Sequence, residues 1–218
     1  MSPLRTLASA VAGLLLSVNG CSNQSSPEAA LPELDREADF ARFFPVLRNY
    51  APDDDFAQII VNRPISDHLA IFACRLILRP NGATGIDYVL KRNLTLYGIS
   101  EAELMEACYA NFFDRKIEVQ VLEQDDSRLF QLTCADGLVA AIIGDSSTHK
   151  KFSDMVGSHD LTVLIVNPDL ICVTARGSAF ESHFPEIVRE QEGGSEVIDL
   201  SASIVYWNAQ ENLTEMRP

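Results

Sequence analysis

Cysteine is the residue type in this sequence best suited to nucleophilic, redox or metal chemistry, yet its spacing fits none of these. Apart from Cys21, four cysteines remain, each with apolar or small neighbours: Cys74, Cys108, Cys134 and Cys172. They form no Cys-x-x-Cys pair, the spacing that redox and zinc sites use. A free cysteine in apolar surroundings behaves as a small hydrophobe. We therefore expect four buried thiols, and the alternatives are one or two disulfides or a catalytic thiol.

The histidines are also poorly placed for a metal site or a catalytic triad. None forms an i, i+4 pair on a helix and there is no His-Glu-x-x-His motif; the four are His68, His149, His159 and His183. His159-Asp160 could supply two members of a Ser-His-Asp triad. The Gly-x-Ser-x-Gly elbow that commonly carries the nucleophile is missing, so we interpret His159 as a surface residue.

Phosphate-binding and cation-binding loops are equally incomplete. Residues 82–85 (Gly-Ala-Thr-Gly) lack the lysine of a P-loop and predict a turn. Asp53–Asp55 lacks the spaced ligands and central glycine of a calcium loop and predicts a solvated turn. Carboxylates are numerous, and a catalytic pair brought together only in space cannot be recognised from spacing. We expect no metal ion or organic cofactor.

Composition indicates an ordinary globular chain with strong acidic character. Its 218 residues are 47% hydrophobic and 22% charged, enough to bury a core within a single domain. The 17 Lys and Arg face 31 Asp and Glu, giving a formal net charge of −14. That balance argues against nucleic acid as a partner and against a basic patch that would bind anionic lipid.

The N-terminus carries the most specific motif. Arg5 is followed by an apolar stretch, residues 6–18, too short for a convincing membrane span and typical of a secretory signal. The segment ends in Val18-Asn19-Gly20-Cys21, which resembles the lipobox of bacterial lipoproteins, although Asn19 is bulkier and more polar than usual. The resemblance implies cleavage before Cys21 and lipidation of that residue. A plain secretory signal and a buried helix of a cytosolic protein are the alternatives.

These motifs divide the chain into four parts. We expect a lipoprotein signal peptide over 1–20, a flexible Ser-, Pro- and Glu-rich tether over 21–39, a folded domain over 40–210 and a tail over 211–218. The lipid would place the protein in the bacterial envelope. Ser22 stands where an Asp would favour the inner membrane, so the outer membrane is favoured; a cytoplasmic location is the alternative.

The first half of the domain combines helices and strands. Phe40, Phe43, Phe44 and Leu47 fall at helical spacing and predict a helix over 37–49, kinked at Pro45. The apolar runs 59–61 and 69–78 predict strands. Ser100 and Glu103 form a capping box, which predicts a helix over 101–113 that buries Leu104, Cys108 and Phe112.

The second half predicts hairpins separated by helices. Residues 117–121 alternate as a half-buried strand, and Asp136-Gly137 predicts a hairpin turn between 129–134 and 138–143. The remaining predicted elements are a helix over 147–156, a hairpin of 161–166 with 170–175, a helix over 179–191 and a strand over 203–207. The order favours an α+β fold: a single domain with a mixed, mostly antiparallel sheet and about four helices packed on it.

From about residue 86 to 210 the layout resembles the YtpQ-type family of uncharacterised bacterial proteins. The resemblance is carried by Tyr88-Val89, by 96–104 (Leu-Tyr-Gly-Ile-Ser-Glu-Ala-Glu-Leu), by 107–111, by 161–170 (Leu-Thr-Val-Leu-Ile-Val-Asn-Pro-Asp-Leu) and by 198–201. It implies an α+β domain and supplies no catalytic residues.

Together these features favour a membrane-anchored lipoprotein whose acidic domain binds another protein without catalysing a reaction. An envelope hydrolase with an unrecognised carboxylate or thiol site and a cytosolic domain of unknown function are the alternatives.

Overall fold

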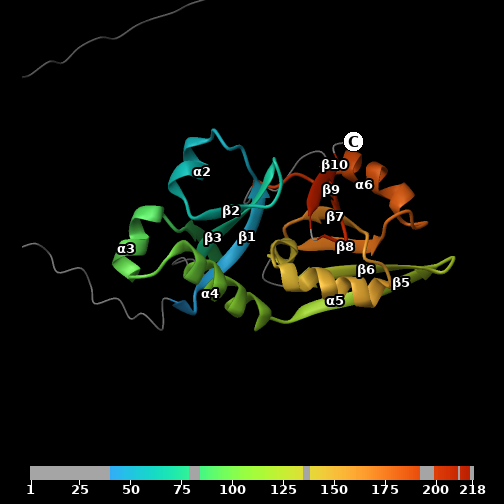
Figure 1. The fold of residues 1–218 in the computed structure, drawn as a ribbon, viewed down its shortest axis with the longest axis horizontal. Coiled ribbons are helices and arrows are strands. Elements are labelled where there is room, and N and C mark those ends of the chain that lie inside the picture. Colours follow the sequence, from blue (N-terminus) through green and yellow to red (C-terminus); the bar gives the residue numbers. More distant parts are fainter. Residues whose placement is uncertain (1–39, 79–83, 135–137, 192–198, 211, 217–218) are drawn as a thin grey trace, which may run out of the picture. The chain divides into compact units, whose positions relative to one another are not determined.

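The computed structural model describes residues 40–78, 84–134, 138–191, 199–210 and 212–216. All of them belong to one compact unit, Asp35–Pro218. The α+β fold expected from the sequence is confirmed (Figure 1). The described strands form two antiparallel sheets in place of the single sheet expected, and a shared core of buried side chains joins them. No described helix is both long and apolar enough to cross a membrane.

The first sheet is built around β3 (Leu69–Leu78), which confirms the strand expected there. Strand β1 (Phe43–Asn49) pairs with one side of β3, and β2 (Asn62–Pro64) and β4 (Thr84–Tyr88) also pair with it. The helix expected over 37–49 is therefore wrong. Residues 43–47 are all buried, so their pattern has neither a helical nor a strand period. Pro45 is compatible with β1 because that strand lies at an edge of the described sheet.

A short helix replaces the strand expected over 59–61. Helix α2 (Asp55–Ile59) begins at Asp54, whose carboxylate accepts a hydrogen bond from the Phe56 N–H at 3.0 Å. Asp53–Asp55 is thus a helix start rather than only a solvated turn. Ile60 forms an isolated bridge with Leu90, and the strand proper begins at Asn62.

Helix α4 (Glu101–Phe113) confirms the helix expected there. It follows a single turn of 3-10 helix, Lys91–Asn93, and the short helix α3 (Leu94–Tyr97). The Ser100 N–H donates to Glu103 at 2.7 Å, and this hydrogen bond lowers the pKa of the Glu103 carboxyl. Leu104, Cys108 and Phe112 are buried as expected, and the helix packs mainly on β1 and also on β3.

The second sheet has the strand order β10-β9-β7-β8-β6-β5. The hairpin of β7 (Leu161–Asn167) and β8 (Leu170–Ala175) and the strand β9 (Ser203–Trp207) confirm the expected elements. The tail expected over 211–218 is wrong in part. Leu213–Met216 form β10, which pairs with β9 and extends the domain beyond residue 210.

The hairpin that contains residues 129–134 turns before these residues, at Asp125-Asp126, and not after them as expected. Strands β5 (Ile117–Gln124) and β6 (Ser127–Cys134) are joined by Asp125 and Asp126, which both have positive φ. Aspartate tolerates that conformation better than most residues, so a hairpin turn can form without glycine. Residues 139–144 are the 3-10 helix η2 (Val139–Gly144), not a strand; Asp136-Gly137 lies outside the described residues.

Helices α5 (Ser146–Val156) and α6 (Phe184–Glu190) cover opposite faces of the second sheet. Phe152 of α5 belongs to the core that contains Val163 and Val205, whereas Phe184 of α6 packs with Leu164 and Ile204. Successive residues of a strand point to opposite faces, so the two helices lie on different sides. The expected helix 147–156 is confirmed from one residue earlier. The expected helix 179–191 is shorter, with Pro185 in its first turn after the 3-10 turn Glu181–His183.

Candidate functional site

The four cysteines that the structure describes are free and buried, as expected. Burial raises the pKa of the Cys108 thiol to about 12 and that of Cys172 to about 11, and it raises the pKa of Cys74 well above its usual value. A reactive cysteine needs an accessible thiolate. These side chains therefore serve as apolar packing, and none is placed to act as a nucleophile.

In the described part of the chain, no imidazole ring is hydrogen-bonded to another imidazole or to a serine hydroxyl. His68, His159 and His183 are exposed. Asp160 accepts a hydrogen bond from the Ala209 N–H at 3.3 Å, a structural contact at the end of β9. His149 is buried against Trp207, with ring centroids 5.0 Å apart, and its Nε2 lies 3.0 Å from the His159 carbonyl oxygen. We interpret His149 as part of the core.

No group of three or more His, Cys, Asp or Glu in the described part of the chain could hold a metal ion. Cys21, the expected lipidation site, lies outside the described residues, as do Gly82 and Ala83 of the expected turn over 82–85; Thr84 and Gly85 begin β4.

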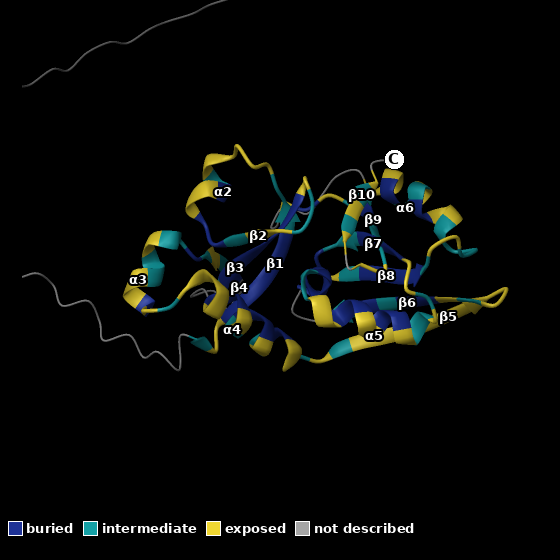
Figure 2. Ribbon diagram, in the orientation of Figure 1, coloured by how far each residue is buried: buried dark blue, intermediate teal, exposed yellow. Residues whose placement is uncertain are grey.

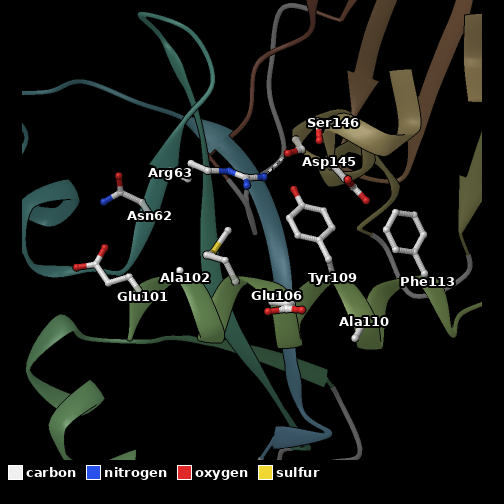
Figure 3. Close-up of a pocket in the computed structure, with 12 residues that line it drawn as sticks. Asn62, Arg63, Glu101, Ala102, Glu106, Tyr109, Ala110, Phe113, Asp145 and Ser146 are labelled. Atoms are coloured by element: carbon white, nitrogen blue, oxygen red, sulfur yellow. Dashed lines mark hydrogen bonds between the residues drawn. The ribbon is translucent and has the colours of Figure 1, made fainter. Parts of the chain in front are cut away.

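The best candidate site is a pocket of about 650 Å³ on the exposed side of α4 (Figure 3). Its apolar floor comes from one stripe of this helix: Ala102, Met105, Tyr109, Ala110 and Phe113. The opposite wall comes from β2, with Asn62 and Arg63, and from the junction of η2 with α5, residues 144–146. Three segments far apart in the sequence therefore build it.

The wall is held together by Arg63, Tyr109 and Gly144. The Arg63 guanidinium donates a hydrogen bond to the Gly144 carbonyl and lies 5.5 Å from the centre of the Tyr109 ring. The Tyr109 hydroxyl donates to the Ala141 carbonyl at 3.0 Å. A Cβ at position 144 would collide with that hydroxyl and with the Ile71 side chain, so the close approach requires glycine.

Tyr109 acts in this wall as a neutral hydrogen-bond donor. Burial raises the pKa of its phenol well above the usual value, an effect that the Arg63 charge only partly offsets. Its hydroxyl consequently stays protonated at physiological pH and is not poised to act as a base.

Two aromatic side chains of the pocket are stacked on each other, and a cation lies near each ring. Tyr109 and Phe113 stack with their centroids 6.1 Å apart, Arg63 lies over Tyr109, and Lys151 lies 5.0 Å from the centre of Phe113. Phe113 is still one of the large hydrophobic side chains that remain exposed. Tyr109 is only 8% exposed, so the accessible aromatic surface of the pocket comes mainly from Phe113. Both rings already attract cations.

Carboxylates surround this aromatic floor. Glu101 and Glu106 project from α4, and Asp145 stands on the opposite wall (Figure 3). Asp145 also caps α5 by accepting from the Ser147 N–H at 2.9 Å. The combination can hold a group that is apolar in one part and positively charged in another. The Ser147 hydroxyl donates to Asp145 at 3.1 Å, within the first turn of α5.

Only part of this site has a recognisable signal in the sequence. Met105 and Tyr109 are adjacent to the predicted buried face of α4, but Arg63 and Gly144 are 81 residues apart and carry no motif. Directly before Pro64, Arg63 has the sequence context of a turn.

Comparison of the chain with protein-family models, with characterised proteins and with solved structures finds no match.

Proposed function

We propose that this chain is a lipid-anchored protein of the bacterial envelope whose α+β domain binds a partner protein, and that a basic, amphipathic segment of the partner occupies the α4 pocket. The observation that carries this proposal is the pocket's apolar floor under a rim of carboxylates. Aromatic anchors in a concave site with a polar rim are typical of protein-recognition surfaces.

Charge favours a cationic occupant. Glu101, Glu106 and Asp145 outnumber the two cations that lie over the rings, Arg63 and Lys151. The Arg63 guanidinium is already engaged with Gly144 and Tyr109. The chain as a whole has a net charge of −14. A basic segment would be steered toward this surface, whereas an acidic one would be repelled.

The lipid anchor is the second part of the proposal. Its support is the run from Val18 to Cys21 behind a short apolar stretch. Two or three acyl chains hold a protein on a bilayer far more firmly than the single chain that gives only marginal binding. The resemblance of residues 86–210 to the YtpQ-type family implies an α+β domain and supplies no catalytic residues to carry over, which is compatible with a binding role.

The test of the binding site uses two model peptides. Both are amphipathic helices of about fifteen residues. One is built from Lys and Leu and the other from Glu and Leu, so they differ only in the sign of their charge. We expect the Lys/Leu peptide to bind and to shift the backbone NMR signals of residues 102–113 and 144–146, and the Glu/Leu peptide to leave them unchanged. Equal binding of both peptides, or shifts confined to other surfaces, would refute the pocket.

Paired variants separate this site from general charge attraction. The double variant Glu101→Gln with Glu106→Gln removes two charges from the rim. It should weaken binding of the Lys/Leu peptide about tenfold, or about 1.4 kcal/mol. Glu118→Gln with Glu123→Gln removes two charges from β5, away from the pocket, and should change affinity less than about twofold. Similar losses in both pairs would mean that net charge alone attracts the peptide.

The anchor is tested by mass spectrometry of the protein purified from bacterial membranes. We expect an N-terminal Cys21 that carries acyl chains, and we expect Cys21→Ser to give an unlipidated product. An intact Met1 terminus or a bare Cys21 would favour the cytosolic alternative and would leave the pocket proposal standing.

A further inference from the structure

Strand β5 is a sheet edge whose only protective residues within the strand are two charged ones, Glu118 and Glu123. It is the last strand of the second sheet, and in the described part of the chain only β6 pairs with it. Its eight residues contain neither proline nor glycine, and their register with β6 is unbroken. Natural proteins usually protect such edges with bulges, prolines, short strands or charged residues.

Apolar side chains are exposed on both faces of this edge (Figure 2). Val119 is 47% exposed and Val121 46% on one face, and Leu122 is 39% exposed on the other. The expectation that the face of 117, 119 and 121 is half buried is therefore wrong for the two valines. The hairpin reaches beyond the rest of the sheet (Figure 1), and α5 packs on β6 and β8.

The turn geometry determines which backbone groups face outward. Gln124 pairs with Ser127 across the two-residue turn, and such flanking residues form a hydrogen-bonded pair. Pairs then alternate along the ladder, so even-numbered residues of β5 bond to β6. The N–H and C=O groups of Ile117, Val119 and Val121 accordingly point to the free edge.

The outward edge is complementary to itself. If two copies of β5 pair antiparallel about Val119, Val119 faces Val119 and Ile117 faces Val121. On the other face Glu118 lies opposite Gln120, and Lys116 lies opposite Leu122, so no two like charges are directly opposed. Moving the centre to Gln120 would place Glu123 against Ile117, and moving it to Val121 would place Glu123 against Val119. The Val119 register alone matches every apolar residue of this face.

We propose that β5 is a self-association surface, at which two copies of this chain join their six-stranded sheets through an antiparallel β5–β5 pair centred on Val119. A strand edge of this length covers less surface than a standard permanent interface, so the dimer is weak. The negative charge of each copy opposes the encounter at long range, and salt should therefore strengthen it. This inference does not depend on the α4 pocket.

The first experiment is sedimentation velocity on the full chain over about 1–300 μM. Every sample carries Cys21→Ser, so that Cys21 neither bears lipid nor forms cross-links. We expect a monomer–dimer equilibrium that shifts toward dimer when salt rises from about 0.1 to 0.5 M. A monomer throughout this range would overturn the proposal, as would a dimer that dissociates in salt.

Two substitutions test the edge itself. Val119→Pro removes an outward N–H that β6 does not use, and Val121→Lys places a charge on the apolar face. Each should weaken dimerisation at least about tenfold. Thr214→Lys makes the same charge change on β10, at the opposite edge of the sheet, and should leave dimerisation unchanged. A dimer unaffected by both β5 substitutions lies elsewhere, and the proposal would fail.

Cysteine cross-linking tests the register. In the proposed pair the two Val119 Cα atoms lie about 5.5 Å apart, within the range of a disulfide. The two Val121 Cα atoms would be about 14 Å apart, because each is displaced two residues from the centre. We expect Val119→Cys to form disulfide-linked dimers under mild oxidation and Val121→Cys to form few. The reverse pattern would contradict the register.

Discussion

Arg48 and Arg63 both lie over aromatic rings, and their surroundings differ sharply. Arg48, at the end of β1, lies 4.6 Å from the centre of Phe56 and 5.2 Å from those of Phe72 and Tyr88. Its guanidinium also pairs with Asp199 at 3.3 Å, and its side chain is only 15% exposed. Arg63, on β2, lies 5.5 Å from a single ring, that of Tyr109, and is exposed.

The comparison separates an aromatic cluster already occupied by an arginine of the chain, called here the filled box, from the α4 pocket, called here the open pocket. Around Arg48 the chain supplies the rings, the cation and the carboxylate, so this cluster has no capacity for an external cation. Asn49 strengthens it by donating to Asp199 at 2.8 Å. At the α4 pocket Arg63 and Lys151 lie over the two stacked rings, but three carboxylates line the rim and Phe113 is still 37% exposed. Recognition is therefore expected at α4, and structural stabilisation at Arg48.

The largest loss of stability is expected from a charge on the buried face of α4, the helix that carries the floor of the pocket. Leu104 is fully buried on α4, and Leu104→Asp would place a charge in the core. We expect a loss of about 4 kcal/mol or more in the free energy of unfolding, measured by urea denaturation. Ala102→Asp on the exposed stripe of the same helix is the control, expected to cost less than about 1 kcal/mol. Equal stabilities of the two variants would contradict the assignment of α4's faces.

Emptying the filled box should have the next largest effect. Arg48→Ala removes contacts with three rings and the hydrogen bond to Asp199, at a cost of about 2 kcal/mol. Arg75→Ala breaks the more exposed pair with Asp87 on the same sheet, at 3.0 Å, and should cost less than about 1 kcal/mol. A smaller loss for Arg48→Ala than for Arg75→Ala, again from urea denaturation, would show that the ring contacts contribute little.

Elements with a local signal were predictable from the sequence. Helix α4 begins at the capping box of Ser100 and Glu103, and α5 ends at Gly157 with positive φ. The hairpin of β7 and β8 turns at Asn167-Pro168-Asp169. In each case the residues that determine the boundary are neighbours in the chain.

Elements whose conformation depends on distant partners were not predictable. Five consecutive buried residues in β1 gave no usable period, and pairing with β3 decides the conformation. Strand β5 alternates as a half-buried strand should, yet its exposure depends on how far α5 extends over the sheet. The pocket requires Arg63 and Gly144 to meet across 81 residues, which no spacing rule indicates.

The buried Cys108 thiol predicts that the folded protein loses stability at alkaline pH. Burial raises the pKa of Cys108 from an ordinary value of 9.0 to about 12. The folded state therefore binds this proton more tightly than the unfolded state, so stability is complete below about pH 9 and falls as pH rises toward 12. We expect thermal melts to show a falling Tm above pH 9, with about 1–2 kcal/mol lost by about pH 10.5. Cys108→Ala should be less stable at neutral pH but should lose stability less steeply with alkali; an unchanged slope would exclude Cys108 as a cause.

The smallest effect on stability, and the sharpest test of the comparison, is expected at Arg63. Its side chain is exposed, so Arg63→Ala should cost less than about 1 kcal/mol in urea denaturation. In the open pocket, however, Arg63 occupies the face of Tyr109 that an incoming cation would use. Removing it also deletes a positive charge from an otherwise acidic rim. We therefore expect Arg63→Ala to tighten binding of the Lys/Leu peptide about threefold, measured by fluorescence anisotropy, and Arg48→Ala to leave it unchanged in the folded protein. Weaker binding in Arg63→Ala would mean that the guanidinium shapes the pocket through Gly144 instead of competing for it, and the two arginines would then play the same structural part.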